Sequence, residues 1–166
     1  MPGHLLPLAY FMAPAYCANM AAPLVKFWRG WNRPIHEAWF GSHKTILGFC
    51  AGVTTALVVT IIQRLIGADF SLLDYSSWFP IGLAFGVGAM GGDAVKSFCK
   101  RRLGLAPGTR WIPMDQVDFA LGALIATRPW IALGPADTIT ILAVTFIADL
   151  AVNRIAFHVG IKDTPW

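Results

Sequence analysis

The sequence predicts an all-α protein that crosses a membrane about five times. Hydrophobic residues make up 56% of the 166 residues and charged residues only 13%, whereas a soluble domain has about 25% charged residues. The apolar residues fall in long runs, and the basic residues cluster in the segments between those runs. Such clustering is typical of the loops that orient a membrane protein, and it gives no reason to expect a nucleic acid partner.

The chain offers five apolar runs close to the length of about 20 residues that a helix needs to cross a bilayer. We expect one membrane domain over 1–166, with spans at about 5–25, 46–66, 78–97, 117–133 and 136–157. Three prolines interrupt the first run and predict a kink. In the second run, Gly48 and Gly52 have the spacing that lets helices approach closely. The third run is rich in glycine, the fourth continues through Trp130, and the fifth begins near Pro135.

The distribution of Lys and Arg predicts the orientation of these spans. The segment 67–77 contains no Lys or Arg, whereas two loops, at about 26–45 and 98–116, are basic; their Lys and Arg residues are Lys26, Arg29, Arg33, Lys44, Lys100, Arg101, Arg102 and Arg110. Cytoplasmic loops carry an excess of these residues, so we expect both basic loops in the cytoplasm. With five spans, the N-terminus then lies outside and the C-terminus in the cytoplasm.

Asp93 is the first candidate for chemistry, because it follows Gly91 and Gly92 near the cytoplasmic end of the third span. An acid at such a depth is costly, and it suggests a functional site. The alternative is a structural acid that pairs with a nearby basic residue. If the helix continues, Lys96, Ser97 and Lys100 lie on the same face as Asp93.

Asp115 and Asp118 are the next candidates, since their i, i+3 spacing puts both on one face of the fourth span. Asp115 could instead be an ordinary helix cap, an interpretation that suits Asp118 less well. Together with Asp93, these residues give three carboxylates on two helices that meet at one membrane face. Carboxylates of this kind predict a site for a hard cation, and Mg²⁺ is the ion we expect.

Two basic segments could bind phosphate. The triplet of Lys100, Arg101 and Arg102 suits a phosphate site, but membrane orientation alone also explains it. His43, Lys44 and Thr45 stand directly before the second span, where the amides of a helix N-terminus attract anions. His43 is either a ligand contact or an interfacial histidine. Near the cytoplasmic end of the first span, Asn19 either contacts a nucleotide or caps backbone that Pro23 leaves unpaired.

In their order along the chain, these residues resemble the signature of membrane CTP-dependent cytidylyltransferases. The matching segments are Gly92-Asp93-x-x-Lys96-Ser97-Phe98-x-Lys100-Arg101, then Pro107-Gly108, then Asp115-Gln116-x-Asp118. The likeness covers nearly the whole chain and is greatest to the archaeal CDP-archaeol synthase family. Bacterial and eukaryotic CDP-diacylglycerol synthases typically show His-Gly-Gly and Asp-Arg-x-Asp, where this chain has Thr109-Arg110-Trp111 and Asp115-Gln116-Val117-Asp118. That departure favours the archaeal family.

The resemblance implies a reaction and its participants. CMP passes from CTP to the isoprenoid ether lipid 2,3-bis-O-geranylgeranyl-sn-glycerol 1-phosphate, giving CDP-archaeol (unsaturated) and pyrophosphate with Mg²⁺, at the cytoplasmic face of the cell membrane. Asp93, Asp115 and Asp118 would be the metal-linked catalytic acids, with Lys96 beside them. The remaining carried-over residues would contact the nucleotide or its phosphates: Asn19, His43, Lys44, Thr45, Ser97, Lys100, Arg101 and Arg102.

Two alternatives stay open at this point. A CTP-dependent polyprenol or dolichol-type lipid kinase would transfer the γ-phosphate to an alcohol, and it would need a group that activates that alcohol. A small membrane transporter would carry charges spread across the depth of the bilayer. No pattern in the sequence supports a covalent nucleophile, and none calls for an obligate protein partner.

Overall fold

The computed structural model describes residues 4–106 and 109–160. In these residues it consists of helices joined by turns and loops. The elements are α1 (Leu5–Ala21), the 3₁₀ helix η2 (Ala22–Phe27), α2 (Glu37–Phe40), α3 (Ile46–Ile66), the 3₁₀ helix η3 (Tyr75–Ser77), α4 (Trp78–Arg102), α5 (Met114–Ala126) and α6 (Pro135–His158). Among the described residues there is no β-strand, only an isolated bridge between Pro34 and Thr45. The predicted all-α class is confirmed.

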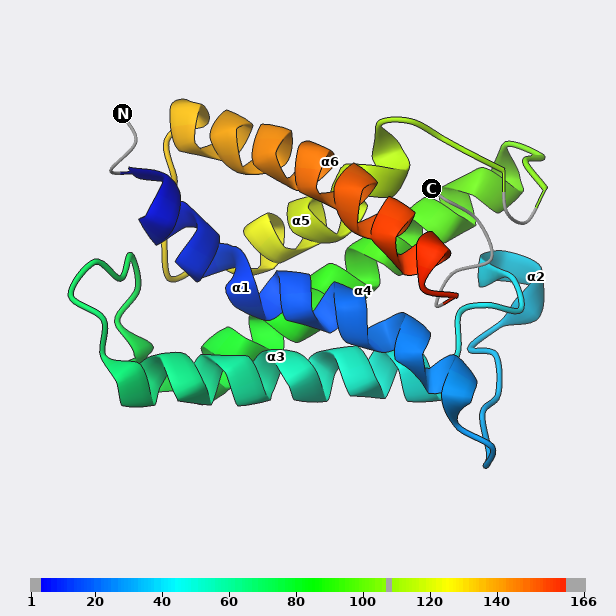
Figure 1. Cartoon of the computed structure of the whole chain (residues 1–166), viewed down its shortest axis with the longest axis horizontal. Helices are drawn as coiled ribbons and strands as arrows, with labels where there is room; N and C mark the ends of the chain where they lie inside the picture. Colours follow the sequence, from blue (N-terminus) through cyan, green and yellow to red (C-terminus); the bar gives the residue numbers. More distant parts are fainter. Residues whose placement is uncertain (1–3, 107–108, 161–166) are drawn as a thin grey trace.

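The long helices alternate in direction along the long axis of the molecule (Figure 1). The segment between η2 and α3 lies at one end, together with the described residues between α4 and α5. The segments 67–74 and 127–134 lie at the other end, and α6 finishes at the end opposite to the start of α1 (Figure 1). Both basic loops are therefore at the same end of the bundle.

Four segments of the described chain are long and apolar enough to cross a membrane: Leu5–Phe27, Ile46–Ile66, Tyr75–Arg102 and Pro135–His158. The fourth expected span, 117–133, does not match the helix in the structure, because α5 starts at Met114 and already ends at Ala126. With 13 residues, α5 is about 20 Å long, short of the roughly 30 Å hydrocarbon core. Pro129 explains the early end, since proline disfavours a helical conformation in the residue before it.

The other helix ends follow local chemistry. Helix α3 matches the expected 46–66, with the hydroxyl of Thr45 accepting a hydrogen bond from the Gly48 amide at 3.1 Å. Gly67 ends it in the left-handed conformation at φ 57°, which glycine adopts without steric cost. In the first segment, the α-helix gives way to the 3₁₀ turn of η2 just before Pro23, which has no N–H to donate.

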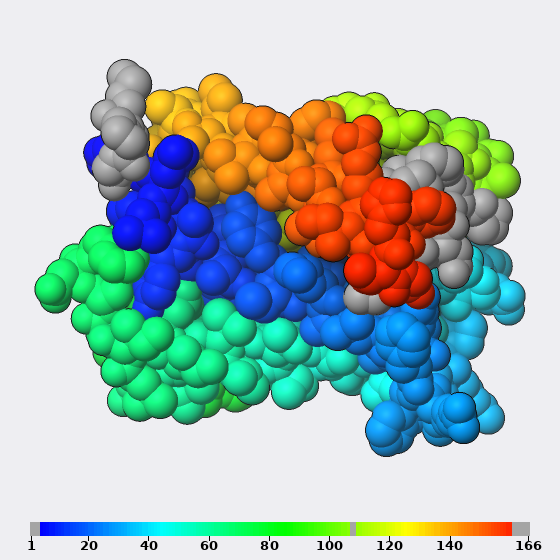
Figure 2. All heavy atoms as spheres, in the orientation of Figure 1, coloured from blue at the N-terminus to red at the C-terminus, as the bar shows by residue number. Residues whose placement is uncertain are grey.

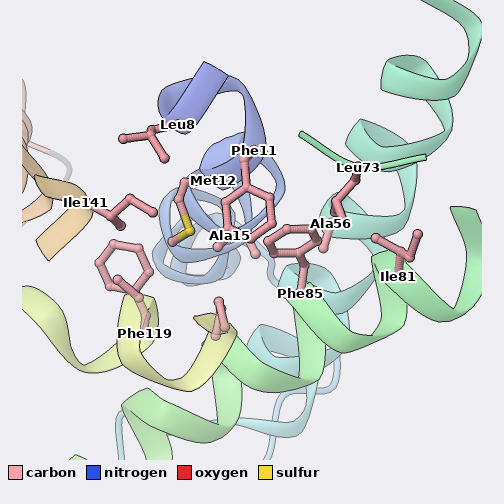
Figure 3. Close-up of a cluster of buried hydrophobic side chains, with 14 of the residues drawn as sticks. Leu8, Phe11, Met12, Ala15, Ala56, Leu73, Ile81, Phe85, Phe119 and Ile141 are labelled. Carbon is pink, nitrogen blue, oxygen red and sulfur yellow. The ribbon is translucent and has the colours of Figure 1, made fainter. Parts of the chain in front are cut away.

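Helix α1 lies at the centre of the fold and contacts α3, α4, α5 and α6. On the face shown in Figure 2, it forms a band between α3 and α6. Its side chains Phe11 and Met12 are buried in the main apolar cluster (Figure 3). The ring of Phe11 meets Phe85 edge to face, with 5.1 Å between centroids, and Ile141 reaches the same cluster from α6.

The outer surface of the bundle is apolar. Large hydrophobic side chains are exposed along the outward faces of α3 and α6, among them Val58, Ile62, Leu65, Ile139, Val144, Ile147 and Ile155. A soluble monomer rarely exposes a continuous apolar surface of this kind, whereas lipid chains cover it in a bilayer. The surface agrees with the prediction of a polytopic membrane protein.

Helices α4 and α5 approach each other closely at three glycines. Gly88 and Gly92 of α4 face Gly122 of α5, and a Cβ at any of these positions would collide with the backbone of the opposite helix. At Gly92 the obstacle is the carbonyl of Asp118. Because Asp93 follows Gly92 directly, this contact brings the acids of the two helices together.

Candidate functional site

The ammonium of Lys96 lies among three carboxylates at the basic end of the bundle. Its Nζ is 3.0 Å from Asp93 Oδ1, 2.7 Å from Asp118 Oδ2 and 3.5 Å from Asp115 Oδ1. The Lys96 side chain is 14% exposed and that of Asp118 only 6%. The structure therefore brings together the four residues expected to be catalytic.

Two further lysines complete this cluster. Lys44 pairs with Asp93, and Lys100 Nζ lies 2.8 and 3.0 Å from the two carboxylate oxygens of Asp115. We call these six side chains the Asp–Lys cluster: Asp93, Asp115, Asp118, Lys44, Lys96 and Lys100. Three negative and three positive charges balance within it.

Local structure fixes the carboxylates of α5. Asp115 Oδ2 accepts a hydrogen bond from the amide of Trp111 at 2.6 Å, in the segment before the helix. Asp118 Oδ1 accepts from the amide of Phe119 at 2.7 Å. The second oxygen of each carboxylate faces a lysine, Lys96 for Asp118 Oδ2 and Lys100 for Asp115 Oδ1, and Lys100 also contacts Asp115 Oδ2. Asp115 has a structural hydrogen bond as well as a place in the cluster.

Lys44 is held by the loop in front of α3. The amide of Ile35 donates to the Lys44 carbonyl at 2.8 Å, and the amide of Ile46 donates to the Arg33 carbonyl at 2.9 Å. These bonds flank the isolated bridge of Pro34 to Thr45. They fix the backbone of Lys44 so that its side chain reaches Asp93 on α4.

The cluster borders a cavity of about 1120 Å³. Nine of the residues expected at the site line it: Asn19, His43, Lys44, Thr45, Asp93, Lys96, Lys100, Asp115 and Asp118. Its other walls include apolar side chains of α1 and η2, such as Met20 and Leu24, with Phe49 of α3. The cavity therefore joins a charged wall to an apolar wall.

Ser97, Arg101 and Arg102 do not line this cavity. The hydroxyl of Ser97 donates to the Asp93 carbonyl within α4 at 2.9 Å. The guanidinium of Arg102 lies over the ring of Phe98, 5.2 Å from its centroid. Because α4 continues to Arg102, successive residues of the basic triplet turn to different sides of the helix.

The carboxylates of the cluster have the chemistry of a Mg²⁺ site. They supply only oxygen ligands, which this ion prefers, and all three already converge on one cation, the Lys96 ammonium. As the described side chains lie, no group of three His, Cys, Asp or Glu residues is arranged to hold a metal ion. The residues fit the ion on the condition that the ammonium moves aside.

Comparison with known proteins decides the family. Residues 3–166 match the family model described as "CarS-like: CDP-archaeol synthase". The chain belongs to the CDP-archaeol synthase family. It is similar to the CDP-archaeol synthase of Methanospirillum hungatei, with 34% identity over 93% of this chain and 100% of the relative. The corresponding protein of Thermococcus kodakarensis is 35% identical, over 95% of this chain and 94% of the relative.

A solved structure supports the same assignment. It is described as "Structural insight into an intramembrane enzyme for archaeal membrane lipids biosynthesis". The match covers 90% of this chain and 94% of the chain in that structure. The TM-score is 0.75 at 29% identity. The predicted family and the prediction of a membrane enzyme are confirmed. Family membership disfavours the lipid kinase and the transporter.

Two polar residues to which the sequence pattern gives no role also lie at the site. Asp149 and Asn153 of α6 line the same cavity, and Asn153 Nδ2 donates to Asp149 Oδ2 at 2.7 Å. Asn153 is buried, with 4% exposure. The signal was present, since Asp149 is an acid inside an apolar span, the feature that identified Asp93.

Proposed function

We propose that this chain transfers CMP from CTP to the lipid phosphate 2,3-bis-O-geranylgeranyl-sn-glycerol 1-phosphate, releasing pyrophosphate and CDP-archaeol (unsaturated). The observation that carries the proposal is the Asp–Lys cluster on the wall of a cavity that also has an apolar side. Membership of the CDP-archaeol synthase family supports the same reaction.

The size of the cavity suits two substrates. At about 1120 Å³ it exceeds the roughly 300–1,000 Å³ of a common small-molecule site. We place the phosphates of CTP at the lysines and the first part of the lipid chains along Met20, Leu24 and Phe49. The amide and carboxylate groups of Asn19, Asp149 and Asn153 would then face the nucleoside.

The proposed reaction needs little help from a base. The second pKa of a phosphate monoester is about 6, so the lipid phosphate is largely dianionic at neutral pH and is already a nucleophile. The main obstacle is repulsion between this dianion and the triphosphate. Phosphoryl transfer depends chiefly on positioning and on electrostatic stabilisation, which a site with three lysines can supply.

In the proposed step, an oxygen of the lipid phosphate attacks the α-phosphorus of CTP in line. The bond from the α-phosphorus to the bridging oxygen breaks, and its electron pair leaves with pyrophosphate. Lys44 and Lys100 pair with Asp93 and Asp115, two acids that Lys96 also contacts. They would neutralise the phosphates before and after the bond breaks. Mg²⁺ bound by Asp93, Asp115 and Asp118 would add positive charge at the phosphates.

We assign the basic end of the bundle to the cytoplasm. The loops that flank the cluster carry the excess of Lys and Arg that marks cytoplasmic loops. The site then opens on the side where CTP is made. The N-terminal end of α1 would lie outside.

The test is a product analysis with purified protein in detergent or lipid nanodiscs. The protein is incubated with Mg²⁺, the lipid phosphate and CTP labelled at the α-phosphorus. We expect the label in a CDP-lipid, with one pyrophosphate released for each molecule formed. A matched reaction with the corresponding lipid alcohol should give no product. CDP and lipid phosphate formed from the alcohol would refute the proposal and indicate a kinase.

A further inference from the structure

Lys96 occupies the position in the cluster that a bound cation would take. Its ammonium contacts all three carboxylates, at 2.7, 3.0 and 3.5 Å. Lys44 contacts only Asp93 among them, and Lys100 contacts only Asp115. Lys96 is therefore distinct from the other two lysines in the number of acids it neutralises.

The charges of the cluster oppose a metal ion that arrives alone. Three acids already balance three lysines, and the side chains of Lys96 and Asp118 are nearly enclosed by protein. A divalent ion that took the carboxylates would leave the Lys96 ammonium without an anion in a confined site. A buried charge that loses its partner is strongly unfavourable.

A triphosphate removes this obstacle. Its oxygens are alternative partners for an ammonium, and the flexible four-carbon stem of lysine allows the head group to turn toward them. The cavity beside the cluster gives the phosphates room, because Lys44, Lys96 and Lys100 all line it. Once the ammonium pairs with phosphate, the position that it holds between the three carboxylates becomes available to a metal ion.

We propose that Lys96 is an internal cation that holds the three carboxylates until a nucleotide triphosphate takes its ammonium and a divalent metal ion replaces it. The inference rests on the proposed function, since it assumes a metal and a nucleotide at this site. It follows that the metal and the nucleotide bind cooperatively, because each removes a cost that the other would meet alone. Binding linkage requires this effect to be reciprocal.

The decisive experiment measures Mn²⁺ binding to the purified full chain without nucleotide, by electron paramagnetic resonance of the free ion. Lys96→Met should bind Mn²⁺ about tenfold more tightly than the unchanged chain, a value within the usual range of coupling between sites. Lys100→Met is the matched control, because it removes the same charge from a lysine that contacts only Asp115 among the three acids. It should raise the affinity much less. Equal effects of the two substitutions, or no effect of Lys96→Met, would overturn the inference.

A second measurement needs no variant and covers the case in which Lys96→Met does not fold. On the unchanged chain, the affinity for CTP is measured in the presence of Mn²⁺ and again in the presence of a chelator. The affinity for Mn²⁺ is measured without CTP and with CTP. We expect weak Mn²⁺ binding alone and CTP affinity about tenfold higher with the metal. Mn²⁺ that binds as tightly without CTP as with it would refute the inference. CDP-lipid formation is scored separately, so the proposed function can hold while this inference fails.

Discussion

The close contact of Gly92 with α5 gives the sharpest prediction, the effect of Gly92→Ala. The added Cβ would lie 3.0 Å from the carbonyl carbon of Asp118 and 3.2 Å from the Cα of Gly122, and nearer still to the Asp118 oxygen. Carbon atoms in good contact are about 3.5–4.0 Å apart. Helix α5 therefore has to move by roughly half an ångström or more, and it carries Asp115 and Asp118 with it.

The size of the effect follows from this displacement. Overpacking a well-packed contact costs about 1–3 kcal/mol, and each kcal/mol lowers the Tm of a chain of this size by roughly 2–4 °C. A catalytic group displaced by about 1 Å can lose a factor of about 100 in rate. We expect Gly92→Ala to lower both the Tm in detergent and the rate of CDP-lipid formation, the rate by about 10- to 100-fold.

Gly91→Ala is the control for this prediction. It is the neighbouring glycine in the same helix, but a Cβ there meets no atom within 4 Å. Alanine in place of glycine inside a helix stabilises it by about 0.5–1 kcal/mol, so Gly91→Ala should keep its activity with an equal or higher Tm. If the two variants behave alike in both assays, the contact of α4 with α5 does not position the acids and the reasoning is wrong.

Three further predictions concern the cavity wall. Asp93→Asn and Asp118→Asn should each abolish CDP-lipid formation while the protein remains monodisperse in size-exclusion chromatography; near-normal turnover in both would contradict the roles of these acids. Lys100→Ala should raise the KM for CTP several-fold, whereas Arg102→Ala, which removes a side chain lying over Phe98 rather than on the cavity, should change it little; steady-state kinetics compares them. Asp149→Asn should lower the preference for CTP over UTP in a competition assay, because an amide can donate to the uracil carbonyl where a carboxylate only accepts; an unchanged ratio would place Asp149 away from the base.

Part of this fold could be predicted because local signals mark it. The apolar run predicts the second span at the bounds that α3 has, and Thr45 and Gly67, which start and stop this helix, lie directly outside that run. The predicted span 117–133 extends past Ala126, where α5 ends, because the apolar residues Trp130, Ile131 and Leu133 follow Pro129 closely. The average hydrophobicity of a segment does not show that a single proline ends the helix within it.

The site itself was only partly accessible from sequence. The sequence indicates Asp93 because an acid near an apolar span is costly, and it indicates Asp115 and Asp118 because their spacing puts them on one helix face. The position of Lys96 between them depends on how closely α4 approaches α5, which Gly92 and Gly122 permit. The sequence does not show that Gly92 and Gly122 face each other across two helices. The basic triplet and the family resemblance predict phosphate contacts for Arg101 and Arg102; both lie on α4 away from the cavity, and their role stays a prediction.

The two interpretations of Asp93, a structural acid paired with basic residues or a functional acid, are compatible in this structure. Asp93 does pair with Lys44 and Lys96, as the structural interpretation requires. Yet an acid kept only for stability gains little from such pairing, because a buried ion pair seldom improves on apolar packing.

The pairing has a different value here. On the proposed mechanism, it holds the three carboxylates in place until a polyanion arrives, and the same lysines then bind that polyanion. On this argument, substituting both partners of a pair, as in Asp93→Asn with Lys44→Met, should restore stability lost in a single variant but not activity.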